Sequence, residues 1–199
     1  MYDKNYYDKF EWNQYYYINT AILKQFLKLP DKSKLLDIGC GTGFHVAGWL
    51  KNSIDAYGCD FSVHAIEKAK LIDTNRFIVA DVRRKLPYAD KEFDIVTCFD
   101  LVEHLDEEYI KPLIKEMRRL SKMWVIVQTL FADEEHHMDM WSRDTTHKLW
   151  KPKQWWLEQI ETTKYGYLMK PFEMMSPGGI ILKFPHPDQL IITTSEEEK

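Results

Sequence analysis

The segment Lys34–Leu50, "KLLDIGCGTGFHVAGWL", places one acid and three glycines where an apolar strand gives way to a helix. The apolar run around Asp37 predicts a buried strand, and the spacing after Gly43 predicts a helix. Glycines at such a turn let a ligand lie against the backbone, with helix N–H groups facing it. The spacing differs from the dinucleotide turn G-x-G-x-x-G, and a carboxylate would repel a pyrophosphate. The loop therefore predicts a site for a ligand whose nearby end is cationic.

Two further acids end the next two predicted strands, Asp60 in "YGCDFS" and Asp81 in "FIVADV". Asp60 follows Gly39 by 21 positions, a separation typical of an acid that accepts hydrogen bonds from ribose hydroxyls. Asp81 lies where an adenine amino group could be bound. The three acids together predict a ligand with an adenosine, a positively charged end and no phosphates.

A second set of chemically capable residues follows the fourth and fifth predicted strands. "DLVEHLDEE" contains Glu103 and His104, and "SRDTTHKLW" contains Asp144 and His147, three positions apart. Histidine is suited to proton transfer near neutral pH, so His104 and His147 are candidate bases. Flat rings that could stack on sugars or bases lie in the same region, at Trp141, Trp150, Trp155 and Trp156. At least one of the last two tryptophans is expected to pack a helix onto the sheet instead.

A metal centre is the alternative use of these side chains. Histidine and carboxylate groups are the usual ligands of divalent ions. The residues that could converge on such an ion are Glu103, His104, His136, His137 and His147. The main interpretation of the sequence assigns no metal ligands.

The elements that must position these residues alternate between strand and helix. Apolar runs of strand length recur within 34–40, 55–62, 76–82, 93–100 and 123–130. Amphipathic segments separate them, and a helix within 15–29 precedes them. Strands separated by helices of this length pair in parallel through right-handed crossovers. The prediction is an α/β, Rossmann-like doubly wound, mostly parallel seven-stranded sheet with helices on both faces.

The last third of the chain departs from this rhythm. Residues 131–156 show no clean period, and long connections of this type are often functional, so they are interpreted as an acceptor-site insertion. A helix follows, and "GIILKF" and "QLIITT", separated by "PHPD", predict an antiparallel C-terminal hairpin. Residues 1–32 are interpreted as an N-terminal helical cap. The whole chain, 1–199, is expected to form a single domain.

Composition narrows the class of protein. The formal net charge of −4 argues against a generic binder of nucleic-acid backbones. No apolar stretch approaches the roughly 20 residues that span a bilayer, and the N-terminus lacks a secretory pattern. The three cysteines, Cys40, Cys59 and Cys98, have no C-x-x-C spacing and are expected to be small buried residues of a reduced, cytoplasmic protein.

The residues 33–130 together resemble a known family. "LLDIGCGTG", "GCDFS", "VADV…LP" and "FDIVTCFDLVEHL" occur in the order found in class I S-adenosylmethionine-dependent methyltransferases. The resemblance implies S-adenosyl-L-methionine as the cofactor. It also implies that the glycine turn (Gly39, Cys40, Gly41 and Gly43) wraps the methionine part, with Asp37 orienting the loop and the ligand's amino group.

The remaining cofactor contacts are implied in the same way. Asp60 would bind the ribose hydroxyls and Phe61 would lie against adenine. Asp81 and Val82 would recognise the adenine edge. The residues that would line the methionine end are Phe99 and Asp100.

The segment "D-x-T-H…WW" resembles methyltransferases of sugar and surface-glycan pathways. We therefore expect methyl transfer to a hydroxyl of a sugar, a glycan intermediate or a small polar metabolite, with His104, His147, Asp144 and Glu103 as the catalytic residues. Nucleic-acid acceptors and membrane insertion are not expected, and no oligomeric state is predicted. Two alternatives remain open: a metal-dependent RNA 3′-end ribose methyltransferase, and a non-catalytic cofactor-binding subunit. The RNA-end enzymes have Glu-x-x-Glu-His after the fourth strand, where this chain has Asp100 in the first place.

Overall fold

The computed structural model describes residues 15–132, 138, 142, 144–160, 173–175, 181–183 and 190–194, with side chains described only within 20–160 and at Thr193. The helices within these ranges are α2 (Tyr15–Phe26), α3 (Phe44–Lys51), α4 (Val63–Ala69), α5 (Ile110–Leu120) and α7 (Lys153–Ile160), with the short 3₁₀ turns η1 (Val102–His104) and η2 (Glu107–Tyr109). The strands are β1 (Lys34–Ile38), β2 (Asp55–Asp60), β3 (Phe77–Val79), β4 (Phe93–Phe99), β5 (Ser121–Gln128), β6 (Glu173–Met175), β7 (Ile181–Lys183) and β8 (Leu190–Thr194).

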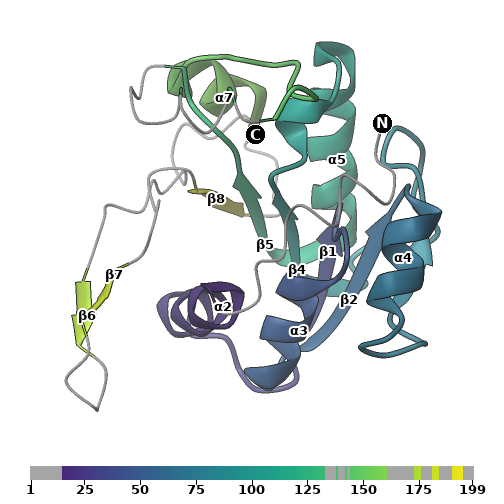
Figure 1. Ribbon diagram of the computed structural model, residues 1–199, viewed down its shortest axis with the longest axis vertical. Helices are drawn as coiled ribbons and strands as arrows, with labels where there is room; N and C mark the ends of the chain where they lie inside the picture. Colours follow the sequence, from purple (N-terminus) through teal and green to yellow (C-terminus); the bar gives the residue numbers. More distant parts are fainter. Residues whose placement is uncertain are drawn as a thin grey trace.

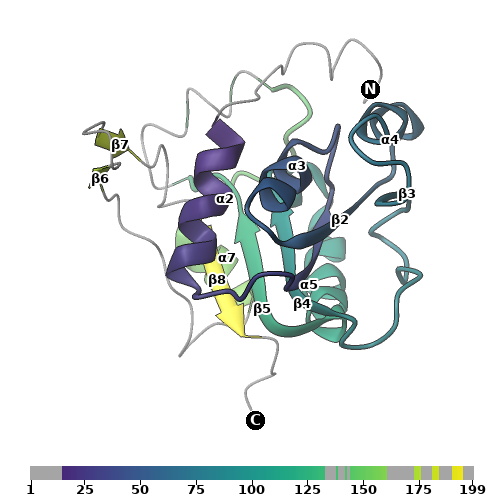
Figure 2. The same ribbon diagram turned by 90° about the horizontal axis from the view of Figure 1, so that it is seen from below.

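The main sheet has the strand order β3-β2-β1-β4-β5-β8 (Figures 1 and 2). The pairs β1–β2, β1–β4, β2–β3 and β4–β5 are parallel, and β8 runs antiparallel to β5. The chain therefore starts at the middle of the sheet, builds outward through β2 and β3, and returns to β4 on the other side. This reversal of strand order beside β1 creates the switch point at which doubly wound sheets bind ligands.

The parallel Rossmann-like sheet is confirmed, whereas the expected seven strands and the C-terminal hairpin are not. The main sheet has six strands in the described part of the chain, five of them parallel. The two segments predicted to pair with each other pair elsewhere, since β7 pairs with β6 in a separate two-stranded sheet and β8 pairs with β5. Pro185 and Pro187 lie between them, and proline has no N–H to donate to a ladder.

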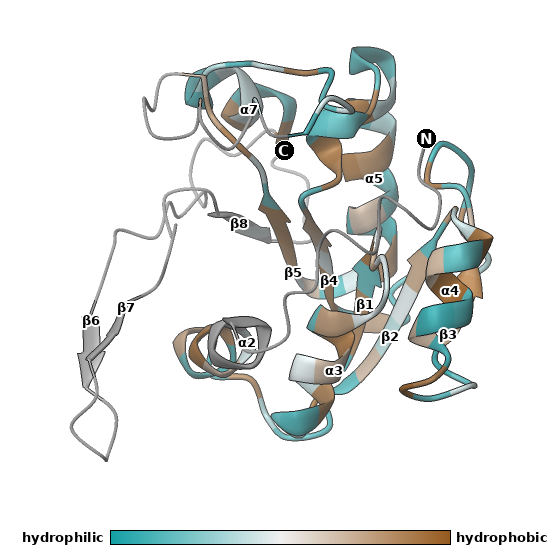
Figure 3. Ribbon diagram, in the orientation of Figure 1, coloured by the Kyte–Doolittle hydropathy of each residue, from teal (hydrophilic) through white to brown (hydrophobic). Residues whose placement is uncertain are grey.

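The sheet is covered on both faces, as expected (Figures 1 and 2). Buried residues of α5 and α7 form one core cluster against the strands, and buried residues of α2, α3 and α4 form the other. The strands alternate between the two clusters, so that Leu35 faces one and Leu36 the other, and likewise Ile126 and Val127. Figure 3 shows the consequence as apolar strands between helices with one apolar and one polar side.

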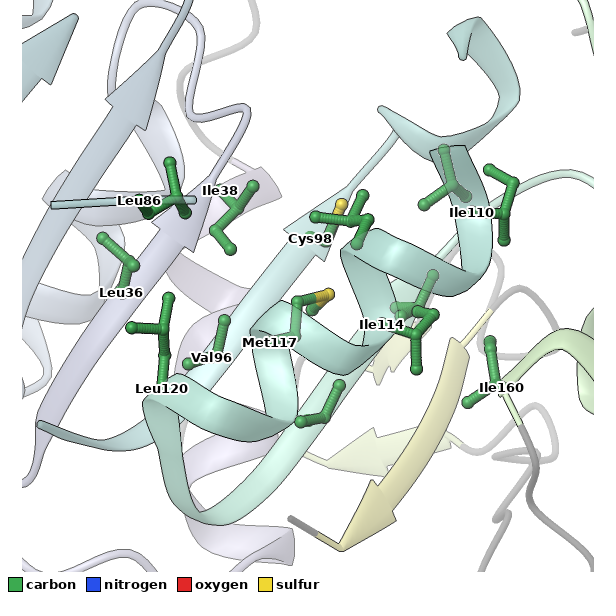
Figure 4. Packing of buried hydrophobic residues seen from close by; sticks show 14 of the residues in the cluster. Leu36, Ile38, Leu86, Val96, Cys98, Ile110, Ile114, Met117, Leu120 and Ile160 are labelled. Carbon is green, nitrogen blue, oxygen red and sulfur yellow. The ribbon is translucent and has the colours of Figure 1, made fainter. Parts of the chain in front are cut away.

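Helix α5 shows why its sequence forms this element. Its buried residues Ile110, Leu113, Ile114, Met117 and Leu120 recur at helical spacing, and they lie between the helix and the strands (Figure 4). Arg118 and Arg119 lie in the last turn, where positive charge favours the negative end of the helix dipole. This packing fixes α5 on the strands and thereby holds the loop between β4 and α5, which carries η1.

The predicted helix at 15–29 is present as α2, within the proposed N-terminal cap, and residues 1–14 lie outside the described residues. The three cysteines are free and buried, as expected. Among the described residues, none of the helices has the length and apolar character needed to cross a membrane.

Candidate functional site

The strands β1, β2 and β4 end at one edge of the sheet. Ile38 pairs in register with Cys59 on one side and with Cys98 on the other. Asp60 directly follows Cys59, and Asp100 follows Cys98 by two positions, so both lie near the glycine turn that follows Ile38. The acids that the sequence analysis singled out on β1, β2 and β4 therefore share one edge, although the chain separates them by 23 to 63 positions.

The glycine turn is closely packed from both sides. Gly39 and Gly43 have φ angles of +74° and +85°, and Gly43 is the N-cap of α3. A Cβ atom added to Gly39 would lie 2.7 Å from the Leu101 side chain, and one added to Gly43 would lie 2.9 Å from Phe77. Both the backbone conformation and the lack of space require glycine here.

Asp60 ties this turn to the start of α4. Its side chain is 5% exposed. Oδ2 accepts a hydrogen bond from the Gly41 N–H at 3.0 Å, and Oδ1 accepts one from the Ser62 N–H at 2.8 Å. Each carboxylate oxygen has two lone pairs, so these bonds leave capacity for hydroxyl donors. The position is compatible with the expected ribose contact, which stays a prediction.

Asp37 is a buried acid among other acids. It is 1% exposed, and the Thr97 hydroxyl donates a hydrogen bond to its Oδ1 at 2.6 Å. Burial raises the pKa of Asp37 to about 7, the Thr97 bond acts in the opposite direction, and the charges of Asp60 and Asp100 add to the rise. A cationic ligand at this edge would restore the charged carboxylate, in agreement with the ligand predicted from the sequence.

The predicted adenine side of the site is partly occupied by a protein contact. The Phe61 side chain is 47% exposed, as a stacking role would require. The Arg83 guanidinium donates to both carboxylate oxygens of Asp81 at 2.8–3.2 Å, and its hydrogen bonds lower the pKa of Asp81. Asp81 would therefore have to share its carboxylate between Arg83 and adenine. The adenine contacts of Asp81 and Val82 stay predictions.

Phe99 ends β4 and Asp100 follows it, and both were predicted to line the methionine end of the cofactor. Phe99 is buried, and its ring meets His45 edge to face with centroids 4.6 Å apart. Asp100 is exposed and has a φ angle of +51°, an uncommon conformation for a residue other than glycine. The Gln128 amide donates to both Asp100 oxygens at 3.0 and 3.1 Å, which fixes the carboxylate at the mouth of the site.

Glu103 lies in η1 and is 1% exposed. The Thr129 hydroxyl donates to its Oε2 at 3.2 Å, and burial together with the charge of Asp100 raises its pKa well above the usual value. The carbonyl oxygen of Glu103 accepts hydrogen bonds from the N–H groups of Lys148 and Leu149 at 2.8 and 3.1 Å. These bonds fasten the segment 144–149 to η1.

A chain of hydrogen bonds links His104 to Asp144. The Thr146 hydroxyl donates to Asp144 Oδ1 at 2.6 Å and lies 2.9 Å from His104 Nδ1. The Thr146 N–H also donates to Asp144 Oδ1, at 2.8 Å, so this oxygen acts as an acceptor twice. Burial and the charge of His147 lower the pKa of His104 to about 4.

The structure brings the four predicted catalytic residues into one group. Atoms of Glu103, His104 and His147 that can act as ligands all lie within 4.8 Å of one another. The rings of His104 and His147 have centroids 4.6 Å apart and planes tilted by 40°. Asp144 joins this group through the Thr146 hydroxyl.

Sequence reasoning missed the side chains that orient the predicted ones, namely Thr97, Gln128, Thr129 and Thr146. Only Thr146 carried a local signal, because an acid two positions before it is typical of a side-chain-closed turn. The other three reach partners that are distant in the sequence, at separations of 26 to 60 positions.

Some of the remaining candidates of the acceptor segment lie outside the described residues, and others are placed by the structure. His136, His137 and Trp141 lie outside the described residues. Trp156 is fully buried in the core under α7, which confirms the packing role expected for at least one of the paired tryptophans, and Trp155 meets its ring edge to face.

Residues 36–123 match the family profile described as "Methyltransferase domain". Over 113 residues the chain is 29% identical to a demethylmenaquinone methyltransferase of Roseiflexus sp., covering 54% of this chain and 46% of that protein. Over 101 residues it is 31% identical to a ubiquinone biosynthesis O-methyltransferase of Histophilus somni, covering 46% and 41%. The chain spans less than half the length of these curated relatives.

Among solved structures, the fold is similar to that of magnesium protoporphyrin IX methyltransferase from Synechocystis, which has S-adenosylhomocysteine bound. The TM-score is 0.62 at 14% identity, over 89% of this chain and 81% of the other. Residues 36–123 thus match a methyltransferase domain, and the solved structure shares the fold. S-adenosylmethionine is the cofactor that these comparisons support. The sugar and glycan subgroup is not shown by these comparisons.

The residues present fit that cofactor. Asp37, a buried acid that has acidic neighbours, would suit the positive charge of its ammonium and sulfonium groups. Its ribose needs acceptors such as the Asp60 oxygens, and its adenine needs an exposed flat surface such as Phe61.

Proposed function

We propose that this chain transfers the methyl group of S-adenosylmethionine to a hydroxyl of a small polar acceptor, with sugars and glycan intermediates as the first class to test. When bound, the cofactor supplies an electrophilic methyl group. Similarity to a ubiquinone biosynthesis O-methyltransferase supports oxygen as the methylated atom. The choice among hydroxyl acceptors rests on the sequence of the segment 131–156.

The observation that carries the proposal is the group formed by Glu103, His104 and His147, with Asp144 bound to it through Thr146. A hydroxyl is a poor nucleophile until it loses its proton, so an O-methyltransferase needs groups that handle that proton beside the methyl donor. Glu103 and His104 follow β4 by only a few residues, so this group lies next to the edge assigned to the cofactor.

In this proposal, different residues of the chain bind the cofactor and position the acceptor. Asp37, Asp60 and the glycine turn hold the cofactor, and Asp100, fixed by Gln128, faces its methionine end. The hydrogen bonds from Lys148 and Leu149 to Glu103 hold the acceptor segment against η1. The acceptor oxygen would thus lie between η1 and the segment 144–149, which backbone hydrogen bonds hold together. Such fixed positioning of the acceptor is what methyl transfer requires.

The test compares variants of the acceptor group with a variant of a residue that contacts the same segment from outside. Asp144→Ala and His147→Ala should each lower turnover by roughly 10²–10⁴ while cofactor affinity stays near normal. Asp106→Ala is the control, because the Asp106 carboxylate pairs with Lys148 on the exposed side of this segment. Turnover is measured with labelled S-adenosylmethionine on a panel of sugar, nucleotide-sugar, phenolic and RNA acceptors, and affinity by calorimetry.

The outcomes separate the candidate functions. Equal turnover in both variants and the control would remove the acceptor role of this segment. Turnover only with RNA 3′ ends would favour the RNA-end enzyme, and cofactor binding without turnover on any acceptor would favour a non-catalytic subunit.

A further inference from the structure

We propose that Glu103, His104 and His147 form a binding site for one divalent transition-metal ion of the class of Zn²⁺, Co²⁺ or Mn²⁺. The three side chains offer one carboxylate oxygen and two imidazole nitrogens, and these atoms all lie within 4.8 Å of one another. Two imidazoles with one carboxylate are a donor set of first-row transition metals, whereas Mg²⁺ and Ca²⁺ prefer oxygen ligands throughout.

The separation of the donor atoms is close to what one ion needs. Bonds of about 2.0–2.2 Å to nitrogen and oxygen place two ligand atoms roughly 3–4 Å apart around a shared ion. The observed upper limit is 4.8 Å, so the donors would have to draw somewhat closer around a bound ion. Tilted imidazole rings with centroids 4.6 Å apart can direct one nitrogen each toward a common point.

The hydrogen bonds of His104 set the tautomer that a metal ligand requires. The single hydroxyl hydrogen of Thr146 is donated to the Asp144 carboxylate, so Thr146 must accept the hydrogen bond at His104 Nδ1. Nδ1 therefore carries the hydrogen, and the lone pair lies on Nε2. Metal-bound histidines commonly donate their second N–H to an oxygen acceptor in this way.

The other two donors are held in place as well. The Thr129 hydroxyl binds the Glu103 carboxylate, and the Glu103 carbonyl binds the N–H groups of Lys148 and Leu149, which follow His147. One local set of bonds therefore joins η1, which carries two donors, to the segment that carries the third. This arrangement orders the site before any ion enters, as a bound metal requires of its surroundings.

Three donors from the described part of the chain leave at least one coordination position for a further ligand, as in catalytic rather than structural metal sites. The ion would lie where the acceptor hydroxyl of the proposed function has to lose its proton, and only this link rests on the proposed function. The site itself is a statement about metal binding and is tested without turnover.

The test uses the full chain, freed of metal by a chelator and dialysed, and titrated with Co²⁺ and with Zn²⁺ in a calorimeter. Wild-type protein should bind one equivalent. His104→Ala and His147→Ala should each weaken binding by at least about 100-fold, while His64→Ala on α4 controls for histidines outside the group and should leave it unchanged. Thr146→Val keeps all three donors but removes the bond that orients His104, and should weaken binding by roughly 10–100-fold.

Melting temperatures recorded without metal show whether each variant still folds. If His104→Ala unfolds, His147→Ala and Thr146→Val carry the test. Absence of saturable binding of one equivalent to the wild type, or binding by folded His147→Ala within twofold of the wild type, would overturn the site. Metal binding without methyl transfer would keep the site and remove the proposed function, and methyl transfer by a protein that binds no metal would do the reverse.

Discussion

At the scale of single residues, the site depends on carboxylates that serve the protein and the ligand at once. Asp60 accepts hydrogen bonds from Gly41 and Ser62 while lying at the edge assigned to the ribose. Asp37 combines burial with a pKa of about 7. Each has a measurable consequence.

Replacement of Asp60 by Ala should weaken S-adenosylhomocysteine binding by more than tenfold, because charge-assisted hydrogen bonds of about 1.5–3 kcal/mol each would be lost. Asp55→Ala is the matched control, since Asp55 begins the same strand and pairs with Arg76 at its other end. Calorimetry of both variants decides the point, and equal affinities would contradict the ribose role.

The ionisation of Asp37 should make the free protein less stable as the pH rises from about 4 to about 7. The folded protein binds this proton with a pKa of about 7 against 3.8 for an unperturbed group, so the native state holds the extra proton in that window. The loss, complete above pH 7, amounts to about 4 kcal/mol at 1.36 kcal/mol per pKa unit. Urea unfolding of wild type and Asp37→Asn at several pH values measures it as the difference between the pH slopes of the two proteins, and equal slopes would contradict the assignment.

The same group predicts the pH dependence of cofactor binding. A cationic ligand requires the charged form of Asp37, so affinity should rise with pH up to about 7 in the wild type and change little in Asp37→Asn. If cofactor affinity depended on pH in the same way in both proteins, Asp37 would not be the acid that meets the charged end of the ligand.

At the scale of elements, α5 holds the loop that carries Glu103 and His104. Met117→Ala should lower the free energy of unfolding by about 2–5 kcal/mol, because Met117 is fully buried between α5 and the strands. Lys115→Ala, on the exposed side of the same helix, should change it by less than about 0.5 kcal/mol. Urea denaturation of both variants is the measurement, and similar losses would mean that helix propensity rather than packing stabilises α5.

Local patterns were sufficient for the following elements. The strands at 34–38, 55–60 and 93–99 were predicted from short apolar runs, which suit parallel strands buried on both faces, and the helix at 15–26 from apolar residues at helical spacing. The C-terminal pairing was not predictable in this way. The partner of β8 is β5, more than 60 positions earlier, and a short period does not encode such a distant choice of neighbour.

For the candidate site, the individual residues could be predicted from the sequence but their grouping could not. Asp37 and Asp60 stood out because an acid at the end of an apolar strand is unusual, and Glu103, His104, Asp144 and His147 because of their chemistry. Their grouping could not be derived from spacing, since it depends on how the segment 144–149 returns to η1, which the backbone bonds to Glu103 determine.

At the scale of the whole molecule, ligand binding at the switch point should stabilise the entire sheet, because the ligand contacts loops from several strands. S-adenosylhomocysteine at 100 times its dissociation constant should add about 2.7 kcal/mol. For a domain of this size this corresponds to a rise in melting temperature of roughly 5–11 °C. A thermal melt with and without the ligand measures it, NAD serves as the control, and a rise with NAD alone would exclude the assigned cofactor.

Because all three cysteines are buried, their labelling by a thiol reagent can report local opening of the structure. Cys40, Cys59 and Cys98 lie at the ligand edge of the sheet, and burial raises the pKa of each thiol, so the folded protein keeps them as unreactive thiols. A thiol-specific dye can label them only in molecules in which this edge of the sheet has locally unfolded. The rate of labelling therefore counts opening events at the place where the ligand enters, and how much a ligand slows that rate reports how firmly it holds the edge closed.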